Sequence, residues 1–245
     1  MNDIGWILIC SGLVFLMQPG FMCLESGLTR TKNSINVAVK NLADFGISGF
    51  LFWGFSFGLM FGSSFWGWLG LDHFLFQVEP DAPRSAAFFL FQAMFCSTAT
   101  TIVSGAVAER LQFAAYGIIA VLVSGIVYPI FGHWAWNGIA TGEAIGWLRQ
   151  LGFVDFSGST VVHSVGAWVA LAALLVIGPR VGRFTPDGQV HKIHGSNLPM
   201  SVLGAMLLWF GWLGFNGGST LAFNDQIAGI MVNTVMSGVA GMLTL

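Results

Sequence analysis

The sequence has very few charged residues for its length. Only 8% of its 245 residues are Asp, Glu, Lys or Arg, whereas soluble domains carry roughly a quarter. The net charge is −2, so no basic surface for nucleic acid is expected. Hydrophobic residues make up 55% of the chain, and the mean hydropathy is +0.77. A soluble fold of this composition would leave too much apolar surface in water, so the composition indicates a membrane protein.

Cysteine and proline are also scarce. Cys10, Cys23 and Cys96 all lie within apolar runs, whereas a disulfide framework or a zinc site would need clustered cysteines in more polar surroundings. We interpret the three as small core residues and expect no metal or other cofactor. The N-terminus lacks a positively charged region and the first apolar run is long, which favours a retained span over a cleaved signal peptide.

Long apolar runs dominate what is present. A helix needs about 20 apolar residues to cross the hydrocarbon core, and the runs here are continuous rather than alternating, which argues against a β-barrel. We therefore predict an all-α, polytopic helical bundle. The seven qualifying runs are 4–28, 42–63, 86–108, 113–134, 158–178, 198–216 and 226–245.

Positive charges gather in alternate connections between these runs. Seven of the nine Lys and Arg residues follow the first, third and fifth runs. The positive-inside rule places these connections in the cytoplasm of an inner-membrane protein and the N-terminus outside. Tryptophans at the predicted outer edge are typical of an interfacial aromatic belt. The seven basic residues are Arg30, Lys32, Lys40, Arg110, Arg180, Arg183 and Lys192, and the tryptophans are at positions 66, 68, 134, 136 and 147.

Glycine is abundant, with 33 residues. In water each glycine costs a helix about 1 kcal/mol relative to alanine, but in lipid small residues allow helix backbones to approach closely. The pattern favours a bundle with tight helix contacts. The glycines that fit this use are Gly12, Gly20, Gly27, Gly211, Gly214, Gly217 and Gly218.

Ionisable residues inside spans are costly and are functional candidates by default. His163 lies within the fifth run, about 10 Å deep if the helix begins near Phe156. A neutral imidazole can both donate and accept a hydrogen bond, so it could relay a proton or guide a small polar molecule. The alternative is a histidine satisfied by a neighbouring helix.

Four acidic residues lie at or near predicted helix ends. Asp155 precedes the fifth helix, where it can cap the backbone or place a fixed negative charge that favours a cation. We interpret Glu25 and Glu109 as helix-end ion pairs or cytoplasmic contacts without a substrate role. Asp44 is expected at the membrane boundary.

A set of aromatic and hydroxyl side chains could recognise a cation. Phe91 and Phe95 are four residues apart and share one helical face, which is also the pattern of ordinary core packing. Trp136 lies at the outer end of the fourth span and Ser219 at the outer end of the sixth. Tryptophan is the best cation–π partner, so a ring face and a hydroxyl could replace part of a small cation's water shell.

Several motifs together resemble the ammonium transporter (Amt/Rh) superfamily, and the bacterial and plant-type members more than the Rhesus glycoproteins. Each motif is weak alone, but their order and spacing span nearly the whole chain. They are E-S-G-L-T-R-T-K-N from Glu25, F-Q-x-x-F from Phe91, G-A-V-A-E-R from Gly105, H-W-A-W from His133, D-F-S-G-S-T-V-V-H from Asp155 and F-G-W-L-G-F-N-G-G-S from Phe210.

The resemblance implies a role for each candidate. Trp136 and Ser219 match an outer site that recruits ammonium, with Phe91 lining the entrance. Phe91 and Phe95 match a stacked phenyl gate. Asp155 matches an acid near the entrance, and His163 matches the first of two paired pore histidines.

The resemblance also implies an architecture of eleven spans, built from two inverted five-helix repeats and one further helix. Residues 1–178 would form the first repeat, 179–197 a cytoplasmic loop, and 198–245 the first two spans of the second repeat. The second pore histidine has no counterpart in this sequence, so the seven spans alone are expected to form an incomplete pore. A homotrimer is implied, with a pore in each subunit.

These features favour transmembrane transport of ammonium or ammonia, with membrane lipid around the bundle and a PII-type regulatory protein as a possible cytoplasmic partner. An ammonium sensor, with a transporter-like membrane domain coupled to a cytoplasmic signalling domain, is the alternative. A neutral-gas channel fits less well, because Trp136 and Ser219 suit a cation. No set of nucleophile, base and orienting residue is visible, so the sequence does not favour an enzyme.

Overall fold

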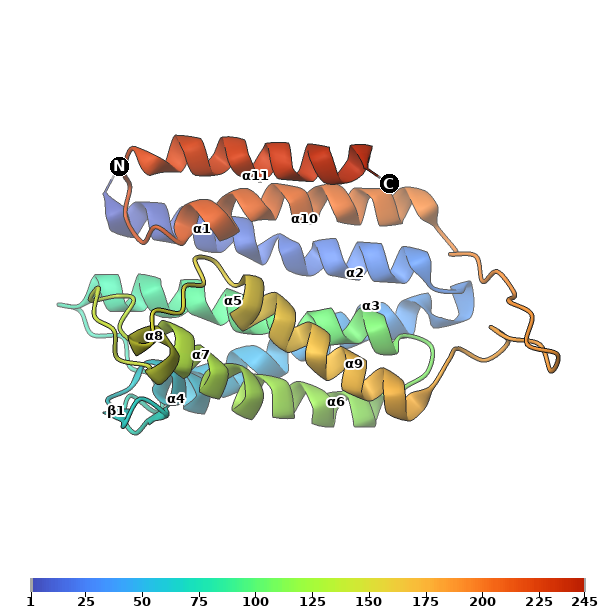
Figure 1. Ribbon diagram of the computed structural model, residues 1–245, viewed down its shortest axis with the longest axis horizontal. Coiled ribbons are helices and arrows are strands. Elements are labelled where there is room, and N and C mark those ends of the chain that lie inside the picture. The colour runs from blue at the N-terminus through green and yellow to red at the C-terminus, as the bar shows by residue number, and fades with distance from the viewer. Residues whose placement is uncertain (1, 245) are drawn as a thin grey trace.

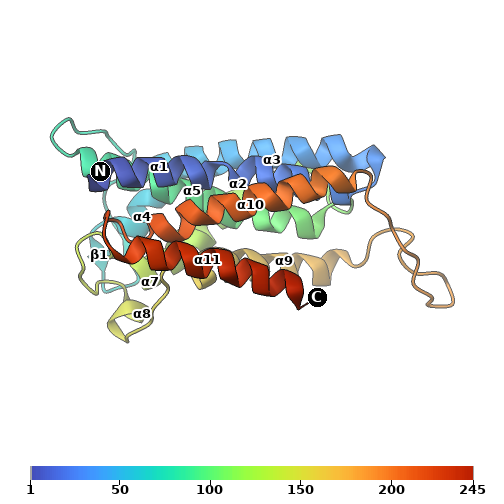
Figure 2. The ribbon, with the colours of Figure 1, turned by 90° about the horizontal axis from the view of Figure 1, so that it is seen from above.

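The computed structural model describes residues 2–244, and it is a bundle of long helices (Figures 1 and 2). Seven helical segments in these residues are long and apolar enough to cross a membrane, which confirms the predicted all-α class. They are Asp3–Leu28, Thr31–Phe61, Pro83–Val107, Phe113–Trp136, Ser159–Ile177, Leu198–Gly218 and Gln226–Leu243.

Several spans contain more than one helical element. The helices are α1 (Asp3–Phe15), α2 (Met17–Leu28), α3 (Thr31–Leu51), α4 (Phe57–Phe61), α5 (Pro83–Val107), α6 (Phe113–Leu122), α7 (Tyr128–Trp136), α8 (Trp147–Gln150), α9 (Val165–Ile177), α10 (Leu198–Gly218) and α11 (Gln226–Leu243). One-turn π-helices, Phe52–Ser56, Val123–Val127 and Ser159–Ser164, interrupt the second and fourth spans and open the fifth. The two short strands are β1 (Ser64–Phe65) and β2 (Leu69–Gly70), which pair antiparallel.

The first span is interrupted near Leu16, between α1 and α2. Pro19 lies just after this point. A proline cannot donate a backbone hydrogen bond, and its ring crowds the carbonyl four residues earlier, here that of Phe15. The break therefore has a local cause in the sequence.

Helix α5 is the centre of the bundle and is buried along most of its length, whereas α11 is largely exposed. Connections alternate between the two ends of the bundle. The end carrying α4, β1 and α8 also holds the start of α1, and the long loop between α9 and α10 extends from the opposite end (Figure 1). The alternation agrees with the order of spans expected from the sequence.

The second span corrects one prediction, because it begins at Thr31 rather than near residue 42. Lys40 and Asp44 therefore lie inside the span, and Asp44 is not at the boundary. Both side chains are buried, whereas Ile35 and Leu42 are 77% and 71% exposed. In the middle of α3, buried polar residues face the protein and large apolar residues face outward, so the mean hydropathy of the span is low although its outward face suits lipid.

Buried polar contacts join α3 to three other helices. The Nζ of Lys40 donates to the carbonyl of Leu111 at 2.6 Å. Asp44 accepts hydrogen bonds from the hydroxyls of Thr101, at 3.0 Å, and Tyr116. The amide of Asn41 donates to Glu25 at 2.9 Å. A buried polar group needs such partners in a medium that offers no water.

Glu25 corrects a second prediction. Its carboxylate is buried and accepts hydrogen bonds from Asn41 and Ser104. None of the ion pairs found within residues 2–244 includes it. The sequence indicates that Glu25 lies near the end of a helix, but it does not show that α3 and α5 cover that end of α2. Glu25 joins helices through hydrogen bonds instead.

Glu109 follows the prediction and forms ion pairs. Its side chain is fully buried, and a carboxylate oxygen lies 2.9 Å from Arg30 and 3.9 Å from Arg180. Burial alone would raise the pKa of this carboxyl, but the hydrogen bonds from the side chain and backbone of Arg30 outweigh it and hold the pKa below 4.5, its ordinary value.

This depressed pKa predicts an acid-dependent loss of stability. The pKa of Glu109 is lower in the folded protein than in the unfolded chain. The stabilisation that ionised Glu109 gives is therefore fully present well above pH 4.5 and is lost as the pH falls through the folded pKa. We expect the thermal midpoint of the detergent-solubilised protein to fall in that window, and to fall less steeply in Glu109→Gln. Parallel pH profiles for the two proteins would contradict the assignment.

Candidate functional site

Trp136 ends α7 and is almost completely buried, with 2% of its surface exposed. Its indole N–H donates to the backbone carbonyl of Asp155 at 2.7 Å. The ring meets Phe95 edge to face, with 5.9 Å between centroids. The fourth span is thereby joined to α5 and to the start of the fifth span.

Phe91 and Phe95 lie together on α5, and both are buried. Their ring centroids are 4.6 Å apart, but the planes are tilted by 54°. Phe95 instead stacks on Phe215 of α10, with centroids 4.1 Å apart and planes 12° from parallel. The expectation that Phe91 and Phe95 form the stacked pair is therefore wrong: the stacked ring is Phe215.

Phe215 lies within the motif that begins at Phe210, but the sequence does not single it out as a site residue. A helix places residues four apart on one face, so its position four residues before Ser219 was the available signal. The sequence could not show which ring of α5 it would meet, because that depends on how α10 crosses α5. Gly218 allows α10 to come close to the Phe91 ring of α5, because a Cβ at position 218 would lie 2.7 Å from that ring.

His163 continues the row of rings. Its imidazole lies 5.6 Å from Phe215 between ring centroids. The fifth span begins with the π-helical turn at Ser159 rather than near Phe156, so His163 is nearer the start of the helix than expected. Trp136, Phe95, Phe215 and His163 thus form a continuous row of rings from four different spans.

The imidazole of His163 is half-buried and borders a cavity of about 850 Å³. Apolar groups form most of the wall, together with a few polar side chains, among them Asn216 and Thr234. The amide of Asn216 donates to the hydroxyl of Thr234 at 2.9 Å. A mostly apolar cavity with a few polar groups is typical of small-molecule sites.

Asp155 caps the fifth span. Its two carboxylate oxygens accept four backbone N–H bonds, from residues 158, 159, 160 and 161, at 2.7 to 3.1 Å. Gly158 makes this possible by adopting a φ of +108°, which glycine tolerates better than other residues. The capping prediction is confirmed. The same residue holds Trp136 through its backbone carbonyl.

Ser219 follows Gly218 at the end of α10 and is partly exposed. Its hydroxyl donates to the carbonyl of Phe215 at 2.8 Å. The oxygen retains lone pairs that can accept a hydrogen bond. The Phe91 ring packs against the adjoining Gly218, so Ser219 lies close to Phe91 and Phe215.

The family model described as "Ammonium Transporter Family" matches residues 5–245. The chain belongs to the ammonium transporter family. It is 64% identical, over 98% of its length, to a Synechocystis protein provisionally named an ammonium transporter. It is 40% identical, over 99% of its length, to ammonium transporter Amt2 of Archaeoglobus fulgidus. These alignments cover 45% and 53% of the relatives, so the chain spans about half the length of the curated ammonium transporters it matches.

Solved structures of ammonium transporter relatives share the fold. A structure titled "Sensor Amt Protein" matches with a TM-score of 0.92 and 43% identity, covering 97% of this chain and 59% of that one. Mep2 of Candida albicans matches with a TM-score of 0.80 and 30% identity, covering 94% of this chain and 51% of that one. The expected relationship to transporters rather than enzymes is confirmed.

Proposed function

We propose that the protein conducts ammonium across a membrane, by way of a site at Trp136 and Ser219 and a dry passage that ends at His163. One observation supports the proposal above the others: the row of rings Trp136, Phe95, Phe215 and His163 is continuous and crosses four spans. The row leads from the end of α7 to a cavity whose wall is mostly apolar and carries a few polar side chains. Membership of the ammonium transporter family supports the choice of substrate.

Each part of the row has a physical task in this proposal. The face of Trp136 attracts the cation, and Ser219 accepts one of its N–H bonds. Trp136 is 2% exposed, so a cation reaches the indole only after neighbouring side chains shift and most of its water is lost. Phe91, which is also buried, lines the entrance to this site in the proposal.

The stacked pair Phe95 and Phe215 acts as the gate, which is a change from the Phe91 and Phe95 pair expected from the sequence. Beyond it His163 accepts or relays the proton that ammonium releases. Potassium has no proton to release and no hydrogen to donate, so a dry passage discriminates against it.

The proposed architecture keeps the domains expected from the sequence: 1–178 as the first repeat, 179–197 as a cytoplasmic loop and 198–245 within the second. We place the protein in the inner membrane with its N-terminus outside, following the distribution of positive charge. A homotrimer surrounded by lipid and a PII-type partner on the cytoplasmic face complete the proposal.

Replacing Trp136 with leucine tests the recruitment site. We expect the apparent affinity for ammonium to fall about tenfold, because a desolvated cation–π contact contributes about 1–2 kcal/mol. The measurement is ammonium-evoked current from the complete gene product on a solid-supported membrane. Phe210→Leu is the matched control, because Phe210 lies on α10 but is 51% exposed. Wild-type affinity in Trp136→Leu would contradict the proposal.

An ammonium sensor is the second candidate, and the observation that favours it is the TM-score of 0.92 to the structure titled "Sensor Amt Protein". The two functions share a binding site but differ in flux. If the complete gene product binds ammonium in calorimetry and carries no current, the sensor is favoured. Current that requires Trp136 and Phe215 favours the transporter.

A further inference from the structure

Asp44 lies near the middle of the second span, Thr31–Phe61, and its side chain is fully buried. Its carboxyl group contacts hydroxyls from two neighbouring spans, Thr101 on α5 and Tyr116 on α6. Thr101 in turn contacts the amide of Gln18 on α2. These side chains join four helices, and the row of rings includes none of them.

The contacts of Thr101 need more hydrogen than its hydroxyl can supply. The hydroxyl oxygen lies 2.8 Å from Oε1 of Gln18 and 3.0 Å from Oδ1 of Asp44. If Asp44 is ionised, both of these oxygens are acceptors, and a threonine hydroxyl has only one hydrogen to donate. One of the two contacts would then bring lone pairs together without a hydrogen between them.

A proton on Oδ1 of Asp44 completes the set. Asp44 then donates to Thr101, and Thr101 donates to Gln18, so each contact holds one hydrogen. Oδ2 of Asp44 still accepts from the hydroxyl of Tyr116. A protonated carboxyl can act in this way, as a donor at one oxygen and an acceptor at the other.

The other source of a second hydrogen is Gln18, if its amide is turned end for end. The amide nitrogen then donates to Thr101, and Thr101 donates to an ionised Asp44. In both arrangements the end of the amide that points away from Thr101 is buried without a partner. The two arrangements therefore differ chiefly in the charge on Asp44.

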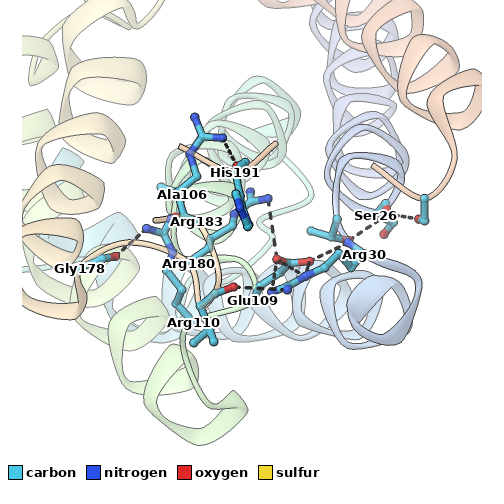
Figure 3. Close-up of polar contacts among 12 residues, drawn as sticks. Ser26, Arg30, Ala106, Glu109, Arg110, Gly178, Arg180, Arg183 and His191 are labelled. Atoms are coloured by element: carbon cyan, nitrogen blue, oxygen red, sulfur yellow. Dashed lines mark hydrogen bonds and ion pairs between the residues drawn. The ribbon is translucent and has the colours of Figure 1, made fainter. Parts of the chain in front are cut away.

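An ionised Asp44 would have no cation in contact with it. Glu109 shows how a buried carboxylate is balanced elsewhere in the bundle, because the guanidinium of Arg30 lies 2.9 Å from it (Figure 3). None of the ion pairs within residues 2–244 includes Asp44. A buried charge without a partner is costly, and such a carboxyl takes up a proton instead.

The other ionisable groups of this region favour the same state. Glu25 of α2 brings a second carboxyl, which accepts hydrogen bonds from two side chains. Lys40, one turn before Asp44, is the only buried lysine or arginine among the described residues, and its Nζ donates to the carbonyl of Leu111. Tyr116 keeps its proton as a donor, and α5 contributes hydroxyl groups. One positive charge can balance one carboxylate, so the region is neutral when Asp44 is protonated and Glu25 is ionised.

We propose that Asp44 is a proton-binding site inside the membrane and holds its proton at neutral pH. The resulting carboxylic acid links α3 to α5 and α6 through Thr101 and Tyr116. Thr101 is six residues beyond Phe95, so the site lies about 9 Å along α5 from the row of rings. No step of the proposed transport mechanism uses this proton.

Infrared difference spectroscopy of the complete gene product in detergent tests the assignment, because a protonated carboxyl and a carboxylate absorb in separate bands. At neutral pH, the spectrum of the wild type minus that of Asp44→Asn should show the carbonyl band of one carboxylic acid per chain. The matched control is Asp72→Asn, which makes the same change at a partly exposed position. It should show carboxylate bands and no acid band. Carboxylate bands in both difference spectra would overturn the proposal and favour the turned amide of Gln18.

Tyr116→Phe gives a second readout in a protein that keeps Asp44. Loss of the phenol hydrogen bond should raise the frequency of the acid band, because a hydrogen bond to a carbonyl oxygen weakens its double bond. Tyr128→Phe is the control, because Tyr128 is also buried but its hydroxyl has no hydrogen-bond partner in the described residues. It should leave the band in place. An acid band that does not move in Tyr116→Phe would overturn the proposal.

Discussion

Replacing Gly204 with valine is expected to separate α10 from α2 and to leave little folded protein. A Cβ at this position would lie 2.3 Å from the backbone nitrogen of Leu24 and 2.6 Å from the carbonyl oxygen of Gly20. Backbone atoms cannot yield as a side chain can, so the helices must move apart. Overpacking costs about 1–3 kcal/mol where side chains can adjust, and here we expect the upper end or more.

The control for this change is Gly229→Val on α11, where a Cβ meets nothing within 4 Å. Size-exclusion chromatography of detergent extracts measures the folded fraction, and a thermal scan gives the midpoint. We expect Gly229→Val to resemble wild type and Gly204→Val to aggregate. Similar profiles for the two variants would show that α2 and α10 are not held at this distance by glycine.

Asp155→Ala is expected to destabilise the start of the fifth span and to impair transport together. Four backbone N–H groups would lose their acceptors, and the loss of a helix cap costs up to about 2 kcal/mol. The turn also positions the carbonyl that holds the Trp136 indole. The measurements are the thermal midpoint in detergent and ammonium-evoked current.

Asp155→Asn separates capping from charge. The asparagine amide keeps one acceptor oxygen and has no negative charge. If Asp155 acts through its cap, the asparagine variant retains part of the stability and current that alanine loses, because its one oxygen can still accept two of the four N–H bonds. If it acts by attracting the cation, the two variants lose current alike. We expect the first result, because both carboxylate oxygens are already engaged by the backbone.

The bounds of the first, third and fifth spans agree with the prediction to within about three residues, because long apolar runs mark them in the sequence. The prediction fails at the start of the second span. Hydropathy averaged along the sequence cannot show that Lys40 and Asp44 face inward while Leu42 faces outward. The depth of a polar group depends on which helices cover it. That information lies in contacts between residues distant in the sequence, such as Asp44 with Tyr116.

The glycines show the same limit. Gly27 and Gly214 allow close helix contacts as predicted, whereas a Cβ at Gly12 would meet nothing within 4 Å. Composition indicates that small residues lie between closely packed helices, but not which face of each helix is packed. For the same reason the sequence predicts the row of rings only in part. It points to Trp136, Phe95 and His163, whereas Phe215 joins them through the packing of α10 against α5.

The inward-facing polar residues of α3 affect how the chain enters the membrane during synthesis. The second span has the lowest mean hydropathy of the seven, 1.3, and a lysine or aspartate near the middle of a lone helix opposes insertion by about 2.5–3.5 kcal/mol. The partners of Asp44 lie on α5 and α6, which are synthesised later. We therefore expect the second span to wait in the translocon until the third and fourth spans emerge, and to leave it with them as a group.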